Sequence, residues 1–342
     1  MSHLDSTALR FHFENQKITL ELLDQTLLPQ EEHWITIKNH SQLIECIQSL
    51  RVRGAPLIGV AASLGLAQAA STTSSNQELK NIFDQLYVTR PTAVNLMNCL
   101  DKMKALLSEP IQLSRYVEKA VEIFQDDFQL CEKMSLWGSQ LINDGDQIIT
   151  HCNTGGLATA GVGTALGAII KAHKSGKKIH VYVDETRPLL QGGRLTTWEL
   201  QKNKIPMTLI TDNMAAHLMS LKKITKAFVG SDRIAANGDF ANKIGTYSLA
   251  VNCFYHHIPF YVVAPRTTVD SQCLTGENIH IELRKPEEVM GVSGHFGKIQ
   301  WAPKDVNCYN PSFDVTPSKL VTGWVLETGI YNQENVQQGV LK

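Results

Sequence analysis

The stretch Gln147-Ile-Ile-Thr-His-Cys-Asn153 is a short apolar run that ends in polar and reactive side chains. Four more runs of this type follow it, and segments of helical composition separate them. Strands that alternate with helices favour right-handed crossovers and a parallel sheet. The five runs are 147–150, 179–183, 207–210, 227–229 and 260–263. We therefore predict an α/β domain with a Rossmann-like parallel sheet over residues 126–342.

Reactive or hydrogen-bonding residues follow every one of these runs. Parallel strands end along the same edge of a sheet, and open α/β sheets bind ligands outside that edge. The segments that follow the runs are His151–Asn153, Asp184–Arg187, Thr211–Asn213, Gly230–Arg233 and Ala264–Arg266. We expect the functional site at the carboxyl edge of the predicted sheet.

The first third of the chain has a different pattern. Apolar and polar residues alternate over 9–13 and over 18–22, on either side of Glu14-Asn15-Gln16, which predicts a hairpin. The segment His33–Lys38 adds a third strand. Helical patterns cover 41–50, 55–70, 76–86, 92–107 and 114–141, of which the last crosses the border between the two parts. Residues 1–125 are predicted to form a smaller N-terminal domain of a short antiparallel sheet plus helices.

The composition excludes several classes of protein. The chain has 342 residues, of which 32 are Lys or Arg and 33 are Asp or Glu, so the net charge is 32 − 33 = −1. This balance argues against a nucleic-acid partner that needs a broad basic surface. The 43% hydrophobic content is far above that of a disordered chain. We expect a soluble globular protein.

Neither a membrane span nor a signal peptide is predicted. The uncharged stretches Ala55–Ala70 and Gly155–Ile170 each hold 16 residues, fewer than the roughly 20 that cross a bilayer. Both are rich in Gly and Ala, which is typical of helices packed closely against a sheet. The N-terminus has no basic region followed by an apolar run. We expect no membrane partner.

The cysteines indicate reduced thiols and no metal centre. Their number is odd, and no C-x-x-C or H-E-x-x-H motif occurs. Widely spaced cysteines fit a cytoplasmic protein better than a disulfide framework or a zinc site. The seven cysteines are at positions 46, 99, 131, 152, 253, 273 and 308.

A nicotinamide-dependent dehydrogenase is the first alternative to weigh. Asp184 follows Gly163 by about 20 residues, where a ribose-binding acid would lie. However, Thr154–Gly163 contains no G-x-G-x-x-G directly after the strand, and Gly156-x-x-x-x-Gly161 is not followed by Lys. These glycines fit either an anion at a helix start or close helix–sheet packing, so the loop does not decide the function.

Cys152 invites a second alternative, a cysteine hydrolase with His151 as its base. Consecutive residues at a strand end point to opposite faces, so the two cannot easily form a nucleophile–base pair. A lone cysteine at a strand end is more often a packing residue. Asp232 follows another central strand, however, and a thiol with a carboxyl at one sheet edge suits proton transfer.

Motifs along most of the chain resemble the methylthioribose-1-phosphate isomerase family. They run in order from about residue 50 to 330, and together they are highly specific. Ser231 departs from the family pattern, where Ala is expected, and Arg266-Thr-Thr replaces a Ser-Thr pair. The motifs are Arg53-Gly-Ala-Pro-Leu-Ile-Gly, Arg90-Pro-Thr-Ala-Val-Asn-Leu, Thr150-His-Cys-Asn-Thr-Gly-Gly-Leu-Ala-Thr, Glu185-Thr-Arg-Pro-Leu-Leu-Gln-Gly-Gly-Arg-Leu-Thr, Gly230-Ser-Asp-Arg-Ile-Ala-Ala-Asn-Gly-Asp, Ala241-Asn-Lys-Ile-Gly-Thr-Tyr and Asn310-Pro-Ser-Phe-Asp-Val-Thr-Pro.

The resemblance implies a cofactor-free aldose–ketose isomerase of methionine salvage. Such an enzyme converts 5-methylthio-α-D-ribose 1-phosphate into 5-methylthio-D-ribulose 1-phosphate, and the family implies a homodimer. It assigns Cys152 and Asp232 as the catalytic pair. It assigns the substrate-binding positions to Arg53, Gly54, Ala55, Arg90, Gln191, Asn242 and Lys243. No metal is implied.

The residue types suit this chemistry. The phosphate on the anomeric carbon prevents spontaneous ring opening, so a group must protonate the ring oxygen while hydrogen moves from C2 to C1. Asp232 can do so near neutral pH if burial raises the pKa of its carboxyl above the reference of about 3.9. Cys152 can take the C2 proton, so that the reaction passes through an enediol. Alternatively, its thiol lies beside the transition state of a hydride shift from C2 to C1. Arg53 and Arg90 offer forks that match a phosphate.

Two rival functions remain open. A ribose 1,5-bisphosphate isomerase is a close relative that needs a second phosphate site. The regulatory subunits of the translation-initiation nucleotide-exchange factor share the fold and several motifs, and they bind and assemble rather than catalyse. Those subunits should lack a matched Cys and Asp at the two strand ends, whereas this chain has Cys152 and Asp232.

Overall fold

A computed structural model describes residues 2–90, 94–294 and 297–342. The chain forms two compact units. Unit 1 comprises residues 1–130 and 156–162, and unit 2 comprises residues 131–155 and 163–342. The expected domain border at residues 125/126 falls inside helix α5 (Leu113–Gln140), within which the chain passes from the first unit to the second.

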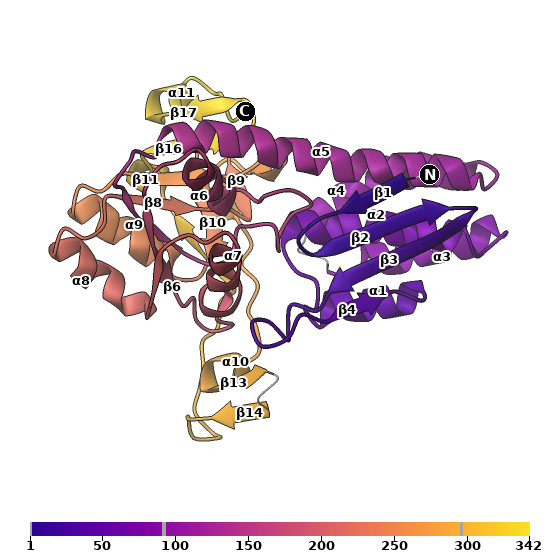
Figure 1. Ribbon diagram of the computed structural model, residues 1–342, viewed down its shortest axis with the longest axis horizontal. Helices are drawn as coiled ribbons and strands as arrows, with labels where there is room; N and C mark the ends of the chain where they lie inside the picture. The colour runs from indigo at the N-terminus through magenta and orange to yellow at the C-terminus, as the bar shows by residue number, and fades with distance from the viewer. Residues whose placement is uncertain (1, 91–93, 295–296) are drawn as a thin grey trace. The chain divides into compact units, whose positions relative to one another are not determined.

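Unit 1 contains a four-stranded antiparallel sheet in the order β1-β2-β3-β4 (Figure 1). The predicted hairpin and third strand are confirmed. Asn15 and Gln16 form the two-residue turn, with φ angles of 50° and 64°, which is the backbone twist that tight hairpins favour. Leu9, Phe11 and Leu20 alternate with polar residues and are buried. The strands are β1 (Ser2–Asp5), β2 (Leu9–Glu14), β3 (Lys17–Leu23) and β4 (Trp34–Thr36).

Helix α2 (Ala55–Ala70) is the buried centre of unit 1, which explains its uncharged sequence. A Cβ on Gly59 would lie 2.7 Å from both Asn95 O and Cys99 Sγ, so only glycine allows α4 to approach this closely. In the described part of the chain, no helix is both long and apolar enough to cross a membrane. The other helices are α1 (His40–Gln48), α3 (Asn76–Tyr87), α4 (Val94–Met103) and the 3₁₀ turn η1 (Lys104–Ser108).

The predicted helices over 76–86 and 114–141 are confirmed. The predicted helix over 92–107 is confirmed from Val94 onward as α4 and η1, whereas Thr92 and Ala93 lie outside the described residues.

The prediction that residues 155–170 form one helix is wrong. Gly155 and Gly163 pair in a bridge, and a Cβ on Gly163 would lie 2.4 Å from Gly155 Cα. The segment between these glycines leaves unit 2 and packs in unit 1, where Ala160 N donates to Asp127 Oδ2 at 2.6 Å. Helix α6 therefore begins only at Ala165, after the left-handed turn at Gly163 (φ 96°).

Unit 2 is built on a seven-stranded sheet in the order β17-β16-β11-β8-β5-β6-β7, in which only β17 is antiparallel to its neighbour. The predicted fold class, a Rossmann-like α/β domain after a smaller antiparallel one, is confirmed, and all five predicted strands are present. The strands are β5 (Gln147–Thr150), β6 (His180–Asp184), β7 (Met207–Ile210), β8 (Lys226–Val229), β11 (Phe260–Val263), β16 (Gly323–Leu326) and β17 (Gly329–Tyr331).

Helices and short turns connect these strands. The end of the Glu185–Thr196 motif, after β6, forms a π-helical turn, η2. Helix α11 (Gln333–Gln337) follows the last strand. The connecting elements are α6 (Ala165–Lys174), η2 (Gly192–Thr196), α7 (Thr197–Lys202), η3 (Asp212–Met214), α8 (Ala215–Ser220), α9 (Thr246–Tyr255), η4 (Arg266–Thr268), η5 (Gly276–Asn278), α10 (Glu287–Met290) and η6 (Ser318–Leu320).

A second sheet of unit 2, in the order β12-β9-β10-β15, was not predicted from the sequence. Its strands are short, and β15 joins from about 70 residues beyond β10. The strands are β9 (Arg233–Ala235), β10 (Phe240–Lys243), β12 (Val269–Asp270) and β15 (Phe313–Thr316), and a separate hairpin pairs β13 (Gly291–Gly294) with β14 (Gly297–Gln300).

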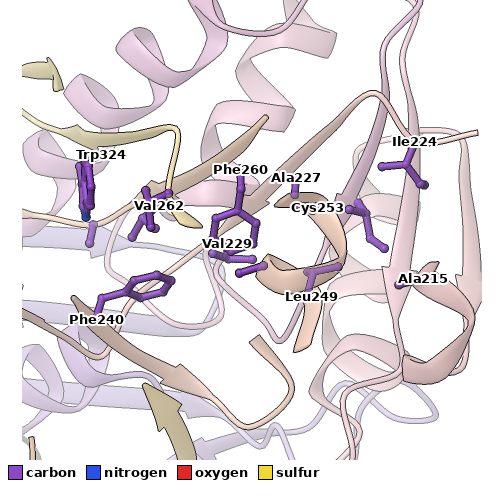
Figure 2. Close-up of a cluster of buried hydrophobic side chains, with 14 of the residues drawn as sticks. Ala215, Ile224, Ala227, Val229, Phe240, Leu249, Cys253, Phe260, Val262 and Trp324 are labelled. Atoms are coloured by element: carbon purple, nitrogen blue, oxygen red, sulfur yellow. The ribbon is translucent and has the colours of Figure 1, made fainter. Parts of the chain in front are cut away.

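The hydrophobic core of unit 2 joins its two sheets. Figure 2 shows Phe240 of the second sheet beside Phe260 and Val262 of the seven-stranded sheet. The Phe240 and Phe260 rings are 6.3 Å apart and both are fully buried, as is Trp324. This packing holds β10 against the strands whose ends carry the candidate site.

Candidate active site

Cys152 and Asp232 follow neighbouring strands of the seven-stranded sheet. β5 pairs with β8 in parallel, with Thr150 opposite Phe228, and Thr150 Oγ1 donates to Phe228 O at 2.8 Å. Adjacent strands lie about 4.8 Å apart. The fold thus brings the two predicted catalytic residues to the same sheet edge, as the sequence pattern predicts.

Cys152 is held in an unusual backbone conformation. Its φ of 66° is left-handed, which is uncommon for a residue with a Cβ. Cys152 N donates to Thr186 Oγ1 at 2.8 Å, and Cys152 O accepts from Thr196 Oγ1 at 2.7 Å. The residue is 6% exposed. Strained backbone that neighbouring groups hold in place is typical of functional sites, and here it fixes the direction of the thiol.

Asp232 enters the second sheet. Asp232 N donates to Ala241 O at 2.9 Å, and Ser231 Oγ lies 3.1 Å from Arg233 O and 3.2 Å from Ala241 O. The departure from the family pattern at Ser231 therefore adds a hydroxyl contact to the turn that carries Asp232. Asp232 itself is exposed. The described residues therefore do not bury its carboxyl, although burial is expected of a general acid.

Asn242 and Lys243 end β10 and are both buried. Lys243 Nζ donates to Ser312 O at 2.9 Å and lies 4.7 Å from the centre of the Phe313 ring. Asn242 Nδ2 donates to Thr246 Oγ1 at 3.0 Å. A buried ammonium group keeps its charge only with such polar and aromatic partners, so Lys243 supplies a fixed cation at the end of this strand.

Gln191 precedes the π-helical turn η2 and is 5% exposed. Its Oε1 accepts no hydrogen bond from the described residues. A Cβ on Gly192 would lie 1.7 Å from Asp184 O, so glycine lets this turn pack directly on the end of β6. Thr196, which bonds Cys152 O, lies on the same turn. π-helical turns occur frequently at functional sites.

The other predicted substrate-binding residues belong to unit 1. Arg53, Gly54 and Ala55 are half-buried at the start of α2, and Arg90 is half-buried after α3. Gly54 has a φ of 94°, and a Cβ there would lie 2.5 Å from Ala158 Cα and O. Only glycine fits this position, where the chain turns into α2 against Ala158.

Two threonines and a histidine ring beside Cys152 have structural roles that the sequence does not reveal. Thr186 and Thr196 bond the backbone of Cys152, and His151 Nδ1 lies 2.9 Å from Asp184 Oδ2 in the interior. The threonines gave no signal beyond their place in the Glu185–Thr196 motif. His151 was considered only as a base for Cys152, and its ring is bonded elsewhere.

His151, Asp184 and Asp212 form a cluster with ligand atoms within 4.8 Å of one another. Both ring nitrogens of His151 are engaged by Asp184 and Ile244 O, and both Asp212 oxygens accept backbone N–H groups, from Thr186 and Arg187, at 2.7 Å. The histidine nitrogens and the Asp212 oxygens are therefore already bonded, whereas Asp184 Oδ1 is buried without a hydrogen-bond partner among the described residues. The bonds that are present form a network that joins the ends of β5 and β6 to the segments around Asp212 and Ile244.

A pocket of about 240 Å³ lies in unit 2 beside this cluster. Neither Cys152 nor Asp232 lines it, so we place the candidate chemistry at the strand ends and not in this pocket. Its walls are formed by Arg187, Pro188, Asp212, Ile244, Gly245, Val289, Tyr309, Asn310 and Pro311.

Comparison with known proteins agrees with the resemblance read from the motifs. Residues 51–333 match the model of the initiation factor 2 subunit family. The chain is 52% identical over 339 residues to the methylthioribose-1-phosphate isomerase of Cronobacter sakazakii, covering 99% of each chain. It is 54% identical over 342 residues to that of Enterobacter sp., covering 100% of this chain and 99% of the relative.

Solved structures agree with these matches. The 5-methylthioribose 1-phosphate isomerase of Pyrococcus horikoshii has a TM-score of 0.87 at 38% identity and covers 98% of this chain and 96% of its own. The translation initiation factor eIF-2B subunit delta from A. fulgidus has a TM-score of 0.84 at 39% identity and covers 96% and 98%. The chain belongs to the initiation factor 2 subunit family, and within it to the group of methylthioribose-1-phosphate isomerases.

Proposed function

We propose that this chain is an aldose–ketose isomerase that converts 5-methylthio-α-D-ribose 1-phosphate to 5-methylthio-D-ribulose 1-phosphate in methionine salvage. The observation that carries the proposal is the thiol of Cys152 and the carboxyl of Asp232 at the ends of paired strands β5 and β8. Near-complete coverage by relatives named for this activity supports it.

In this proposal Asp232 and Cys152 carry out different proton transfers. Asp232 protonates the ring oxygen as the ring opens, and its carboxylate regains a proton when the 2-hydroxyl loses one to form the ketone. Cys152 either carries the proton from C2 to C1 or lies beside these carbons while a hydride moves between them. Asp232 is exposed in the structure, so bound substrate has to exclude water from its carboxyl. Gln191, Asn242 and Lys243 are the substrate-binding residues of unit 2.

A turnover assay with two sugars tests the function directly. We expect conversion of 5-methylthioribose 1-phosphate and much slower conversion of ribose 1,5-bisphosphate, which would need a second phosphate site. Preference for the bisphosphate would favour the related isomerase. Conversion of neither would favour a non-catalytic subunit, the second candidate, which the structural match to the A. fulgidus protein supports.

Arg53 and Arg90 are proposed to hold the substrate phosphate. Arg53→Lys keeps the charge but removes the planar fork that binds two phosphate oxygens at once. We expect kcat/KM to fall about tenfold, the loss of roughly 1.4 kcal/mol of phosphate binding. Arg115→Lys, at an exposed ion pair with Glu109, is the control and should leave kcat/KM unchanged. An unchanged value in Arg53→Lys removes Arg53 from the site.

We also propose a cytoplasmic homodimer. The seven cysteines are free in the structure, as expected of a reducing compartment. Helix α9 presents one apolar face to solvent, with Tyr247, Val251, Phe254 and Tyr255 exposed by 44, 39, 62 and 77%. These residues are spaced as one helical stripe, and large exposed aromatic side chains are typical of interface centres.

The dimer proposal predicts that Phe254→Glu weakens self-association. Loss of one central aromatic residue commonly costs about 2 kcal/mol, so the dimer Kd should rise about 30-fold or more. Sedimentation velocity across a dilution series measures the change. Phe128→Glu replaces another exposed phenylalanine, on α5, and should leave the Kd unchanged. A monomeric wild-type chain at micromolar concentration contradicts the proposal.

A further inference from the structure

His151 lies in the interior of unit 2 and has no role in the proposal above. Its ring is 1% exposed. Nδ1 lies 2.9 Å from Asp184 Oδ2, and Nε2 lies 2.9 Å from Ile244 O. One imidazole thus contacts three segments: the end of β5, which continues into Cys152, the end of β6, and the residue that follows Lys243 at the end of β10.

The partners of the ring determine which nitrogen carries hydrogen. A backbone carbonyl can only accept, so Nε2 carries the hydrogen that it donates to Ile244 O. The remaining hydrogen lies between Nδ1 and Asp184 Oδ2. Burial raises the pKa of Asp184 to about 6, although the hydrogen bond with His151 opposes this rise. Burial lowers the pKa of His151, but the hydrogen bond and charge of Asp184, the charge of Asp212 and the bond to Ile244 O together raise it by more. Both net shifts favour retention of the shared hydrogen.

The segment after Lys243 is packed against this ring. A Cβ on Gly245 would lie 2.8 Å from His151 Cε1, and Gly245 has a φ of 104°, so the backbone turns directly over the imidazole. Gly245 N donates to Asp314 Oδ2 at 2.8 Å, and Ile244 N donates to Ser312 O at 3.2 Å. The Nε2–Ile244 bond is the link between this turn and the strand that carries Cys152.

We propose that His151 is a positioning residue for the isomerisation: its Nε2–H bond to Ile244 O fixes the segment that carries Asn242 and Lys243 relative to the end of β5, and Asp184 orients the ring. This inference rests on the proposed function. It assigns His151 to substrate positioning and not to proton transfer, because no donor atom of the ring remains free to reach substrate.

Two amide variants separate the two bonds of the ring. His151→Gln places an amide nitrogen near the position of Nε2 and keeps a donor for Ile244 O, whereas His151→Asn places it near Nδ1 and keeps only the bond to Asp184. We expect His151→Asn to raise KM about tenfold, with kcat within threefold of the wild-type value. His151→Gln should keep both constants within threefold.

A second pair tests the same link through Asp184. Asp184→Asn retains an N–H donor for Nδ1 and should keep the ring in place, so KM should stay within threefold. Asp184→Ala releases the ring and should raise KM about tenfold. The two Asp184 variants still test the positioning role of His151 if His151→Asn does not fold. His180→Asn, at the opposite end of β6, is the control and should change neither constant.

The outcomes are distinguishable. Equal KM values in the Gln and Asn variants at position 151, or a wild-type KM in Asp184→Ala, would overturn the positioning role while leaving the proposed function intact. Loss of kcat without a change in KM would overturn it as well, because that result indicates proton transfer. Absence of turnover by the wild-type chain would overturn the proposed function and this inference with it.

Discussion

Replacement of Asp232 by Asn is expected to lower kcat by at least about 10²-fold in a chain that stays folded. The amide has the size and hydrogen-bonding groups of the carboxyl but donates no acidic proton, and general acid–base catalysis contributes about 10²–10⁴-fold. Because Asp232 is exposed and its backbone N–H bonds Ala241 O, the change leaves the turn that carries it in place.

The matched control for this variant is Asp144→Asn. Asp144 is an exposed aspartate before β5, and its Oδ1 accepts from Lys178 N, a bond that an asparagine oxygen can replace. Turnover of the control should equal that of the wild-type chain. Near-normal turnover by folded Asp232→Asn would show that the acid is assigned wrongly, and Asp184 would become the next candidate.

The parallel sheet could be predicted from the sequence because its central strands β5, β8 and β11 are buried at nearly every position. Runs such as Gln147–Thr150 and Phe260–Val263 are short and apolar, and they coincide with β5 and β11. A strand covered on both faces needs apolar residues throughout, and this leaves a signal in the sequence. The antiparallel hairpin of unit 1 gave an equally clear signal through the alternation around Asn15 and Gln16.

The second sheet could not be predicted for the opposite reason. Arg233–Ala235 and Val269–Asp270 are three and two residues long, too short for any period to appear. The strand Phe240–Lys243 is buried at every position, yet it carries an asparagine that bonds nearby Thr246 and a lysine that bonds Ser312, 69 residues along the chain. The strands of this sheet pair with strands that lie far away along the chain, and local sequence does not reveal such partners.

The candidate site was predictable only in part. The strand pattern predicts that Cys152 and Asp232 lie at one sheet edge, and the structure puts them after paired strands. Their assignment as the catalytic pair came from the family resemblance. The hydrogen bonds of His151 could not be predicted, since they join residues 33 and 93 positions apart along the chain. His151 and Cys152 do not form the nucleophile–base pair of a hydrolase, because both ring nitrogens of His151 are bonded to Asp184 and Ile244 O.

Cys152→Ser is expected to lower kcat by about 10²-fold, because the hydroxyl keeps the shape of the thiol but is far less acidic. Thr186 and Thr196 bond the backbone of Cys152, so its left-handed conformation should survive the change. Cys308→Ser, at a half-exposed cysteine, is the control and should leave kcat unchanged.

The double variant Cys152→Ser/Asp232→Asn tests whether the two residues act as a unit. Groups that serve one transition state lose most of their effect when either is removed, so the combined loss in kcat should be much smaller than the product of the two single losses. A loss equal to that product would mean that the thiol and the carboxyl contribute independently, in separate steps. If Cys152→Ser alone keeps kcat within threefold, the sulfur takes no part in moving the C2 hydrogen, and its strained backbone serves packing at the strand end.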